Sequence, residues 1–369
     1  MIPRKRGKRA DPEMACDRTR VADHAKCDSR QYFLAALDAF EHAAAVTGRL
    51  VDHSFILRGQ TIRLRFAGTA LIPHIVPALA HLASASAQAP DLTVCLWESA
   101  TSGIGLPPPP WPLADNTSIG EIRDCNPKKR VHALYQPKDQ ALSMLDTEEN
   151  LAVFWTASQI TYHESSSPLH AILSWWTGRE AQVVHAAAVG TARGGVLLTG
   201  KSGSGKSSTA LACLDSSLLY AGDDYVLTTM DPMPYAHSLY NSAKVDPAFM
   251  RNFPCLIPQI SNTDRLQEEK ALVFLYDCLR DKVCKGFPIR AVLSPVITGC
   301  KETTLRKISP AVSLSSLAPT TIMQIPGSGQ EALQAMGRLV SRVHNYALEV
   351  GTDLSGIPAA VTDLLEKLS

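Results

Sequence analysis

The sequence lacks both a long apolar run and an excess of charge of either sign. The most apolar stretch, residues 70–89, is interrupted by Pro73, His74, Pro77 and His81, so we expect no membrane-spanning segment. Lys and Arg number 36 and Asp and Glu 35, which gives a formal net charge of +1. A protein that binds duplex DNA over a wide face usually carries a clear basic excess. We therefore expect neither a membrane nor a nucleic acid as a partner.

Cysteine pairs with the spacing of metal ligands are also lacking. The nine cysteines are odd in number, and the two closest in sequence, Cys278 and Cys284, do not form a Cys-x-x-Cys motif. Scattered, reduced thiols are typical of a cytoplasmic protein. The amino terminus agrees with this, because the basic cluster over residues 4–9 is not followed by the apolar segment of a secretory signal.

Charge is distributed unevenly along the chain. Residues 1–30 hold nine basic and five acidic residues, which leaves 27 basic and 30 acidic residues for the rest. We interpret residues 1–28 as a disordered basic tail. The alternative is that the protein starts at Met14 and that the preceding residues are not part of it.

The length of 369 residues predicts about two domains. Residues 29–100 show the pattern of a small α+β accessory domain, in which a helix begins at Ser29 and a hairpin turns at Gly59-Gln60. Residues 101–160 contain the proline-rich run Gly103–Pro112, which prefers polyproline II, and then short connecting strands. We interpret the run as a stiff linker, with a ligand for an SH3-type domain as the alternative.

The remaining residues, 161–369, form an α/β domain, because short apolar strands alternate there with helices. Strands are expected over residues 55–66, 92–97, 132–136, 141–145, 151–155, 181–189, 196–199, 218–220, 225–228, 271–276 and 289–297. Helices beyond the first are expected over residues 71–82, 205–214, 328–343 and 357–368. The expected fold class is therefore α/β, with a smaller α+β domain at the amino terminus.

A phosphate-binding loop is the most specific motif in the chain. Residues 200–207 match Gly-x-x-x-x-Gly-Lys-[Ser/Thr], and a strand precedes them while a helix follows. Glycines let successive backbone N–H groups surround phosphate oxygens, the lysine reaches the β- and γ-phosphates, and the hydroxyl binds Mg²⁺. We predict phosphate binding by Gly200, Ser202, Gly203, Ser204, Gly205, Lys206, Ser207 and Ser208. The alternative is a glycine-rich turn without a ligand.

Three further residues flank this loop in the sequence. His185 lies 15 residues before Gly200, and the pair Asp223-Asp224 lies 23 residues after it, at the end of an expected strand. An acidic pair near a phosphate loop suits a magnesium ligand and a base. Because adjacent carboxylates repel, one of them is easily kept ready to take a proton.

His185, the loop and the aspartate pair together resemble the catalytic domain of HPr kinase/phosphorylase in order and spacing. The segments Ala236–Lys244, Leu317–Thr321 and Tyr346–Gly351 are more similar to the lasso-peptide precursor kinases of that superfamily. The resemblance covers about residues 160–369, whereas the amino-terminal third resembles the accessory module of those kinases only weakly.

The resemblance implies an ATP- and Mg²⁺-dependent kinase whose acceptor is a serine hydroxyl of a protein or peptide. In that case Lys206 and the loop hold the phosphates, and Ser207 binds Mg²⁺. Asp223 is the base, Asp224 assists or contacts the metal, and His185 neighbours the γ-phosphate or orients Asp223. The alternative for His185 is a core histidine bonded to a backbone carbonyl.

The sequence departs from the HPr kinase pattern in two places. The glutamate that helps to hold magnesium in that family is missing, and Asn241 or Lys244 stands in this stretch instead, as a weak ligand or a positive charge. The Gly-Arg-Asn loop is missing too, so Lys285 or Arg290 becomes a candidate transition-state cation, or else a solvated surface charge. These departures argue against HPr as the substrate and against the reverse phosphorylase activity.

The leading hypothesis is thus a serine kinase for a ribosomal precursor peptide, and a homo-oligomer is compatible with it. A kinase of a small hydroxylated metabolite is the first alternative. The second is a nucleotide-binding regulator without transfer activity, against which the intact Lys206, Ser207 and Asp223-Asp224 argue.

Overall fold

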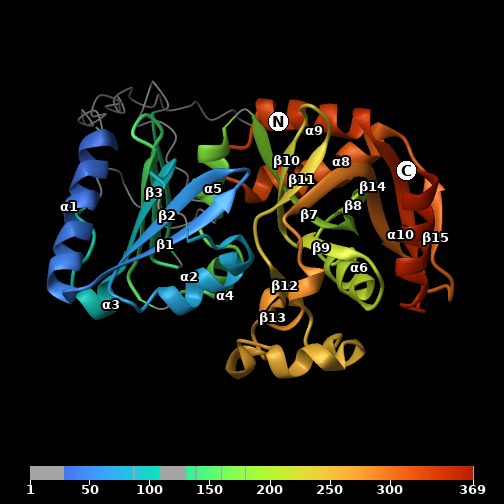
Figure 1. Ribbon diagram of the computed structural model, residues 1–369, viewed down its shortest axis with the longest axis horizontal. Coiled ribbons are helices and arrows are strands. Elements are labelled where there is room, and N and C mark those ends of the chain that lie inside the picture. Colours follow the sequence, from blue (N-terminus) through green and yellow to red (C-terminus); the bar gives the residue numbers. More distant parts are fainter. Residues whose placement is uncertain are drawn as a thin grey trace, which may run out of the picture.

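The computed structural model describes residues 29–85, 88–108, 130–137, 139–158, 160–178 and 180–368. The expected basic tail, 1–28, lies outside the described residues, as does the end of the proline-rich run. In the described residues the chain is a mixed α/β protein with two large sheets side by side (Figure 1). None of the described helices has the length and apolar character needed to cross a membrane.

The amino-terminal domain contains a six-stranded sheet in the order β1-β2-β3-β6-β5-β4. Its strands are β1 (Leu50–Leu57), β2 (Gln60–Ala67), β3 (Leu92–Glu98), β4 (Val131–Gln136), β5 (Ala141–Asp146) and β6 (Leu151–Thr156). The connecting strands expected within 101–160 are therefore part of this domain, because β6 pairs in parallel with β3 at the centre of the sheet. The hairpin turn also differs by one residue: Arg58 and Gly59 form it with φ of 54° and 81°, as a tight two-residue turn requires.

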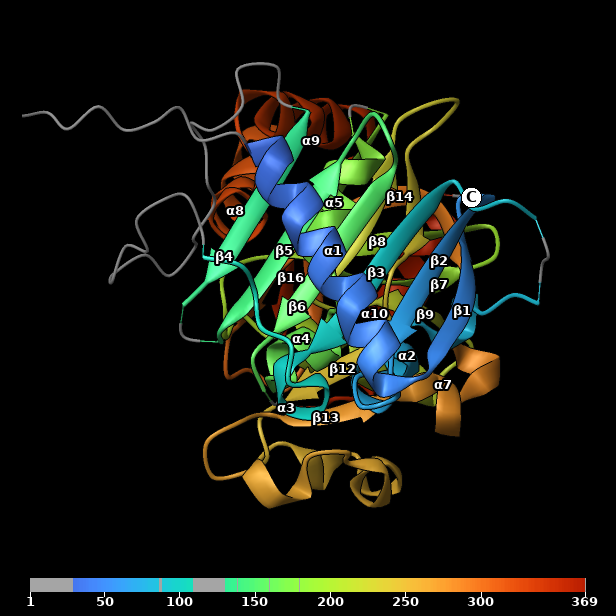
Figure 2. The same ribbon diagram turned by 90° about the vertical axis from the view of Figure 1, so that its left-hand side faces the viewer.

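Helix α1 (Ser29–Thr47) crosses the outer face of this sheet, in front of the strands in Figure 2. Its apolar side chains recur at helical spacing, and Phe33, Ala36 and Phe40 are buried. Phe40 packs edge-on against Trp97 of β3, with 6.2 Å between the ring centroids. The helix thus covers one face, and the other face is left for the carboxyl-terminal domain.

The carboxyl-terminal domain contains an eight-stranded sheet in the order β11-β10-β7-β8-β14-β16-β15, with β9 also paired to β7. Because β11 pairs with both β10 and β14, five of the strands close into a ring. The strands are β7 (Ala181–Thr191), β8 (Gly194–Thr199), β9 (Leu219–Gly222), β10 (Tyr225–Thr229), β11 (Tyr235–Ser238), β14 (Gly286–Ile297), β15 (Thr304–Lys307) and β16 (His344–Val350).

Helices cover both faces of this sheet. On one face α6 (Lys206–Ala212) and α10 (Gly356–Lys367) share a core with Val189 and Leu198. On the other face α8 (Pro310–Gln324) and α9 (Gln330–Arg342) pack on Leu197 and Val292. The sequence did not predict α8, because Pro319 lies in its interior, where helices usually exclude proline, whereas Pro310 stands in the first turn, where proline is tolerated.

A separate hairpin joins the two domains near the lower edge of Figure 1. It consists of β12 (Ser242–Val245) and β13 (Ala271–Phe274). Between them the chain forms the 3-10 turns η3 (Met250–Asn252), η4 (Pro254–Gln259) and η5 (Thr263–Arg265). The remaining short elements are α3 (Ser99–Ser102), α7 (Leu275–Cys278), η1 (Ala80–Leu82), η2 (Cys213–Asp215) and η6 (Arg280–Lys282).

The junction between the domains is built from α2 (Ile72–Leu79), α4 (Tyr162–Ser166) and α5 (His170–Thr177). Leu227 and Tyr240 of the second domain share a core with the inner face of the first sheet. Asn241 is fully buried there, and its amide nitrogen donates to the carbonyls of Pro77 and Ala78 at 2.8 and 2.9 Å. Its amide oxygen accepts from the N–H of Tyr276 at 3.2 Å, so this side chain links α2 to the second domain.

Replacing Asn241 with alanine is expected to destabilise the protein by roughly 1–3 kcal/mol, because buried polar groups on both sides of the junction lose their partner. Urea unfolding measures the loss. The matched control is Asn252→Ala, an exposed asparagine, which should change the free energy of unfolding little. Equal stability of the Asn241→Ala variant and the wild type would contradict this structural role.

Candidate phosphoryl-transfer site

The predicted phosphate loop lies at the carboxyl end of β8. Residues 200–205 connect that strand to α6, which begins at Lys206. Strands β8, β14 and β16 run parallel to one another, so their carboxyl ends meet at the same edge of the sheet. Such an edge is where open α/β sheets bind ligands.

The path of the loop depends on its glycines. Gly203 and Gly205 have φ of 78° and 96°, in the left-handed region that side chains with a Cβ rarely adopt. The N–H of Ser204 closes a turn on the carbonyl of Lys201 at 3.2 Å. Ser202 is exposed, while Ser207 and Ser208 are half-buried in the first turn of α6.

Lys206 is buried with only 6% of its surface exposed. Its ammonium group donates to the carbonyls of Gly200 and Lys201 at 2.8 and 3.2 Å. Burial lowers its pKa, and the negative charges of Asp223 and Asp224 oppose this shift. The lysine ammonium thus contacts the loop backbone and is close enough to the acidic pair for their charges to interact.

The two aspartates form the turn between β9 and β10, and both of these strands pair with β7. The register places Tyr225 opposite His185. Asp224 has φ of 64°, which is strained for a residue other than glycine. Its carbonyl accepts from the N–H of Ala186 at 3.0 Å, and this bond fixes the turn against β7.

Asp224 is held by two basic groups. It forms an ion pair with Lys244 of β12, and its Oδ1 lies 3.8 Å from Nε2 of His185. Burial favours the neutral carboxyl, but the positive charge of Lys244 and the contact with His185 outweigh it and hold the pKa of Asp224 well below its usual range. Asp224 is thus a poor proton acceptor.

The pKa of Asp223 is shifted in the opposite direction, upwards. Only 2% of it is exposed, and its Oδ1 accepts from the N–H of Asp224 at 2.9 Å. Among the described residues its buried Oδ2 has no hydrogen-bond partner. Burial and the charge of Asp224 raise the pKa of Asp223, and the nearby Ser207 hydroxyl offsets part of the rise. One oxygen of this carboxylate is therefore free to take a proton or contact a cation.

The residues present fit Mg²⁺ bound together with phosphate. The Ser207 hydroxyl is an oxygen donor, which Mg²⁺ prefers, the acidic pair lies beside it, and this ion usually takes few protein ligands beside substrate phosphates. Within the described part of the chain no group of three or more His, Cys, Asp or Glu side chains could hold a metal by itself.

Helices α4 and α5 line the other side of the acidic pair, and no sequence signal predicted this. Lys244 lies 5.7 Å from the ring of Tyr162, and its Nζ is 3.5 Å from Nδ1 of His163. His170 stacks on Tyr225 with 5.2 Å between the ring centroids. Burial lowers the pKa of His163 and of His170 to about 4 in each case, so both rings are neutral at pH 7.

Three of the residues considered from the sequence are placed away from the acidic pair or are otherwise engaged. The amide of Asn241 is fully engaged at the domain junction, which removes it as a weak metal ligand. Arg290 donates to the carbonyl of Arg193 at 3.1 Å, at the end of β8 opposite the loop. Lys285 is exposed just before β14, at that same far end. Neither can serve as the transition-state cation, because both lie near the start of β8, whereas the loop follows its end.

His185 is buried on β7 beside the acidic pair. Its backbone N–H donates to the hydroxyl of Thr321 in α8 at 3.0 Å. Its side chain contacts Asp224 rather than Asp223, and its Nδ1 has no partner among the described residues. A direct contact of His185 with the γ-phosphate stays a prediction.

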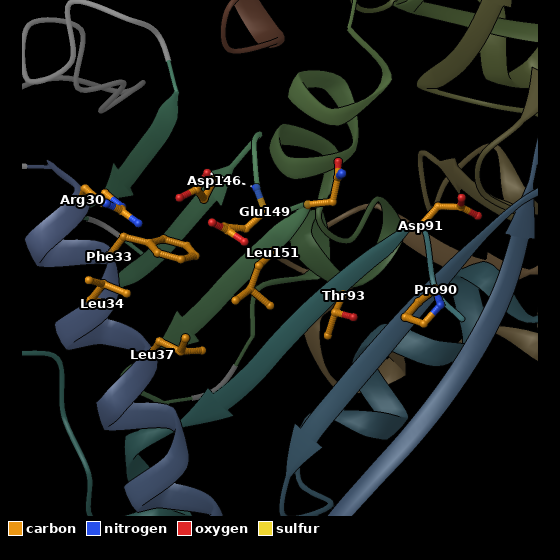
Figure 3. Close-up of a pocket in the computed structure, with 11 residues that line it drawn as sticks. Arg30, Phe33, Leu34, Leu37, Pro90, Asp91, Thr93, Asp146, Glu149 and Leu151 are labelled. Atoms are coloured by element: carbon orange, nitrogen blue, oxygen red, sulfur yellow. Dashed lines mark hydrogen bonds between the residues drawn. The ribbon is translucent and has the colours of Figure 1, made fainter. Parts of the chain in front are cut away.

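A separate open pocket of about 590 Å³ lies on the outer face of the amino-terminal sheet (Figure 3). It is lined by Phe33 and Leu37 of α1, by Thr93 and Leu151 of the sheet, and by the acidic side chain of Glu149. None of the phosphate-loop residues borders it. Because the sheet stands between this pocket and the second domain, the pocket is not part of the candidate site.

No protein-family model matches the chain, and no curated protein matches it. Among solved structures it is similar to the Hpr(Ser) kinase/phosphatase from Coxiella burnetii, with 12% sequence identity and a TM-score of 0.28. The match covers 50% of this chain and 97% of that chain. A likeness of this size carries no argument about fold or activity.

Replacing Asp223 with asparagine is expected to stabilise the protein at neutral pH. The pKa of Asp223 is raised on folding, so the wild type loses stability as the pH rises from about 4, where an unfolded aspartate ionises, through the folded pKa. The neutral amide avoids that loss, so the advantage of the variant should grow with pH over this window. Urea unfolding across pH measures it, with Asp363→Asn at an exposed position of α10 as control; a variant less stable than wild type at about pH 8 would contradict the raised pKa.

Proposed function

We propose that the protein transfers the γ-phosphate of ATP to a hydroxyl group, with a serine of a protein or ribosomal precursor peptide as the acceptor. The observation that carries this proposal is the free, buried Oδ2 of Asp223, which lies next to Ser207 and Lys206 of the phosphate loop. Phosphoryl transfer needs groups that bind the phosphates and a group that receives the proton of the acceptor. The choice of serine rests on the resemblance of the sequence to the peptide kinases.

Each residue of the site has a distinct role in this proposal. The loop N–H groups and Lys206 bind the β- and γ-phosphates. Mg²⁺ held by Ser207 and the phosphates would neutralise charge that develops during transfer. Asp223 Oδ2 takes the proton of the acceptor hydroxyl as that oxygen bonds to phosphorus and ADP leaves. Asp224 stays ionised in its pair with Lys244 and, through repulsion, keeps the pKa of Asp223 high.

The direct experiment uses the full chain with γ-labelled ATP, Mg²⁺ and pairs of peptides that differ only by serine or alanine. Label on the serine peptide alone supports the proposal. Label on a small hydroxylated compound instead would make the protein a metabolite kinase. ATP binding without transfer to any acceptor would contradict a kinase and favour a nucleotide-binding regulator.

Replacing Lys206 with alanine should reduce transfer by about 10²–10³-fold or more, since one preorganised charge on the phosphates is lost. The matched control is Lys201→Ala, an exposed lysine of the same loop, which should keep most of the activity. Initial rates measure both variants. Wild-type turnover of the Lys206→Ala variant would remove the loop from the mechanism.

The Asp223→Asn variant should separate binding from chemistry. The amide has nearly the same shape, so ATP affinity should be unchanged, whereas a general base contributes about 10²–10⁴ in rate. Calorimetry for ATP and a transfer assay measure the two effects. Transfer at the wild-type rate would show that Asp223 is not the base.

A further inference from the structure

Among the residues considered so far only Lys206 supplies a cation near the transferred phosphate, because Lys285 and Arg290 lie at the far end of the strands. The hairpin of β12 and β13 supplies two candidates. Its register pairs Lys244 with Leu272 and Val245 with Ala271. Side chains alternate between the two faces of a strand, so Lys244, Leu272 and the preceding Lys270 belong to one face.

The side chains on the other face of the hairpin are buried in the core. Ala243, Val245, Ala271 and Val273 are buried in the cluster that also contains α6 and α10. The face with Lys244 must therefore point away from that core, and the ion pair of Lys244 with Asp224 shows where it points. Strand β12 also lies against α4, and Nζ of Lys244 is 3.5 Å from Nδ1 of His163 in that helix, so this face lies on the side of the acidic pair.

Lys270 is the next residue on that face. Diagonal neighbours in an antiparallel pair are about 7–8 Å apart, which keeps its long side chain within reach of the site of Lys244. The charge of Lys270 also lowers the pKa of Lys206 and of His163, after burial and other charges. The Lys270 ammonium is therefore close enough to Lys206 for the two charges to interact.

The ammonium group of Lys270 is available to bind a ligand. The residue is exposed, and no hydrogen bond or ion pair of its side chain occurs among the described residues. Two carboxylates of the same segment are engaged elsewhere: Glu269 pairs with Arg265 at 3.2 Å, and Asp246 accepts from the N–H of Ala248 at 2.9 Å. Lys244, in contrast, is bound to Asp224 and is not available to a ligand.

We propose that Lys270 binds the γ-phosphate of ATP. Lys206 and Lys270 are close enough for their charges to interact, whereas Lys244 is already neutralised by Asp224. An anion of high charge between Lys206 and Lys270 relieves their repulsion, and the terminal phosphate carries the most negative charge of the nucleotide. This inference rests on the proposed function, since it assumes a triphosphate in the loop.

The test compares two nucleotides that differ in the γ-phosphate. Calorimetry with Mg²⁺ gives the Kd for ADP and for the stable ATP analogue adenylyl imidodiphosphate. The ratio of the two Kd values measures the contribution of the γ-phosphate without requiring the acceptor. In the Lys270→Met variant this ratio should fall by about tenfold, the value of one charged hydrogen bond, while the Kd for ADP stays at the wild-type value and reports intact folding.

Two further variants sharpen the comparison. Lys270→Arg keeps the charge and should retain most of the ratio. Lys285→Met removes one exposed charge at the opposite end of the strands and should leave the ratio unchanged. A wild-type ratio in Lys270→Met, or an equal fall in Lys285→Met, would overturn the inference and leave the proposed function standing. A wild-type protein that binds neither nucleotide would overturn the proposed function itself.

Discussion

The ion pair between Asp224 and Lys244 is the interaction on which the candidate site depends. Asp224 sits in a strained backbone conformation, with φ of 64°, and such strain persists only where the surroundings impose it. Lys244 of the hairpin, His185 of β7 and the bond from Ala186 together impose it. Because these contacts fix one carboxylate as a charged group, the other is left as the group that can change its protonation.

The two domains meet at this interaction. Helix α4 of the junction places His163 and Tyr162 beside Lys244, and Asn241, three residues earlier in the chain, bonds to α2 of the amino-terminal domain. The segment 241–244 is therefore held by the first domain at one end and by the acidic pair at the other. The amino-terminal domain thereby positions the hairpin that faces the phosphate loop.

The sequence was sufficient where the structure depends on consecutive residues. The loop 200–207 and the pair Asp223-Asp224 are local motifs, and the flanking strands follow from short apolar runs. Contacts between distant segments carry no such signal: the pairing of β6 with β3 and the ion pair of Lys244 depend on which strands become neighbours. Lys285 and Arg290 looked suitable by spacing alone, yet the direction of β14 places them at the wrong end of the sheet.

The central claim is that the two adjacent carboxylates differ, with Asp223 the proton acceptor and Asp224 permanently charged. The most direct measurement is a pH titration of the side-chain carboxyl signals by carbon NMR, in the wild type and in a Lys244→Met variant. The account predicts that Asp223 titrates above, and Asp224 below, the range of an ordinary aspartate, and that the variant brings the two values closer. The reverse order in the wild type, or two equal values, would contradict it.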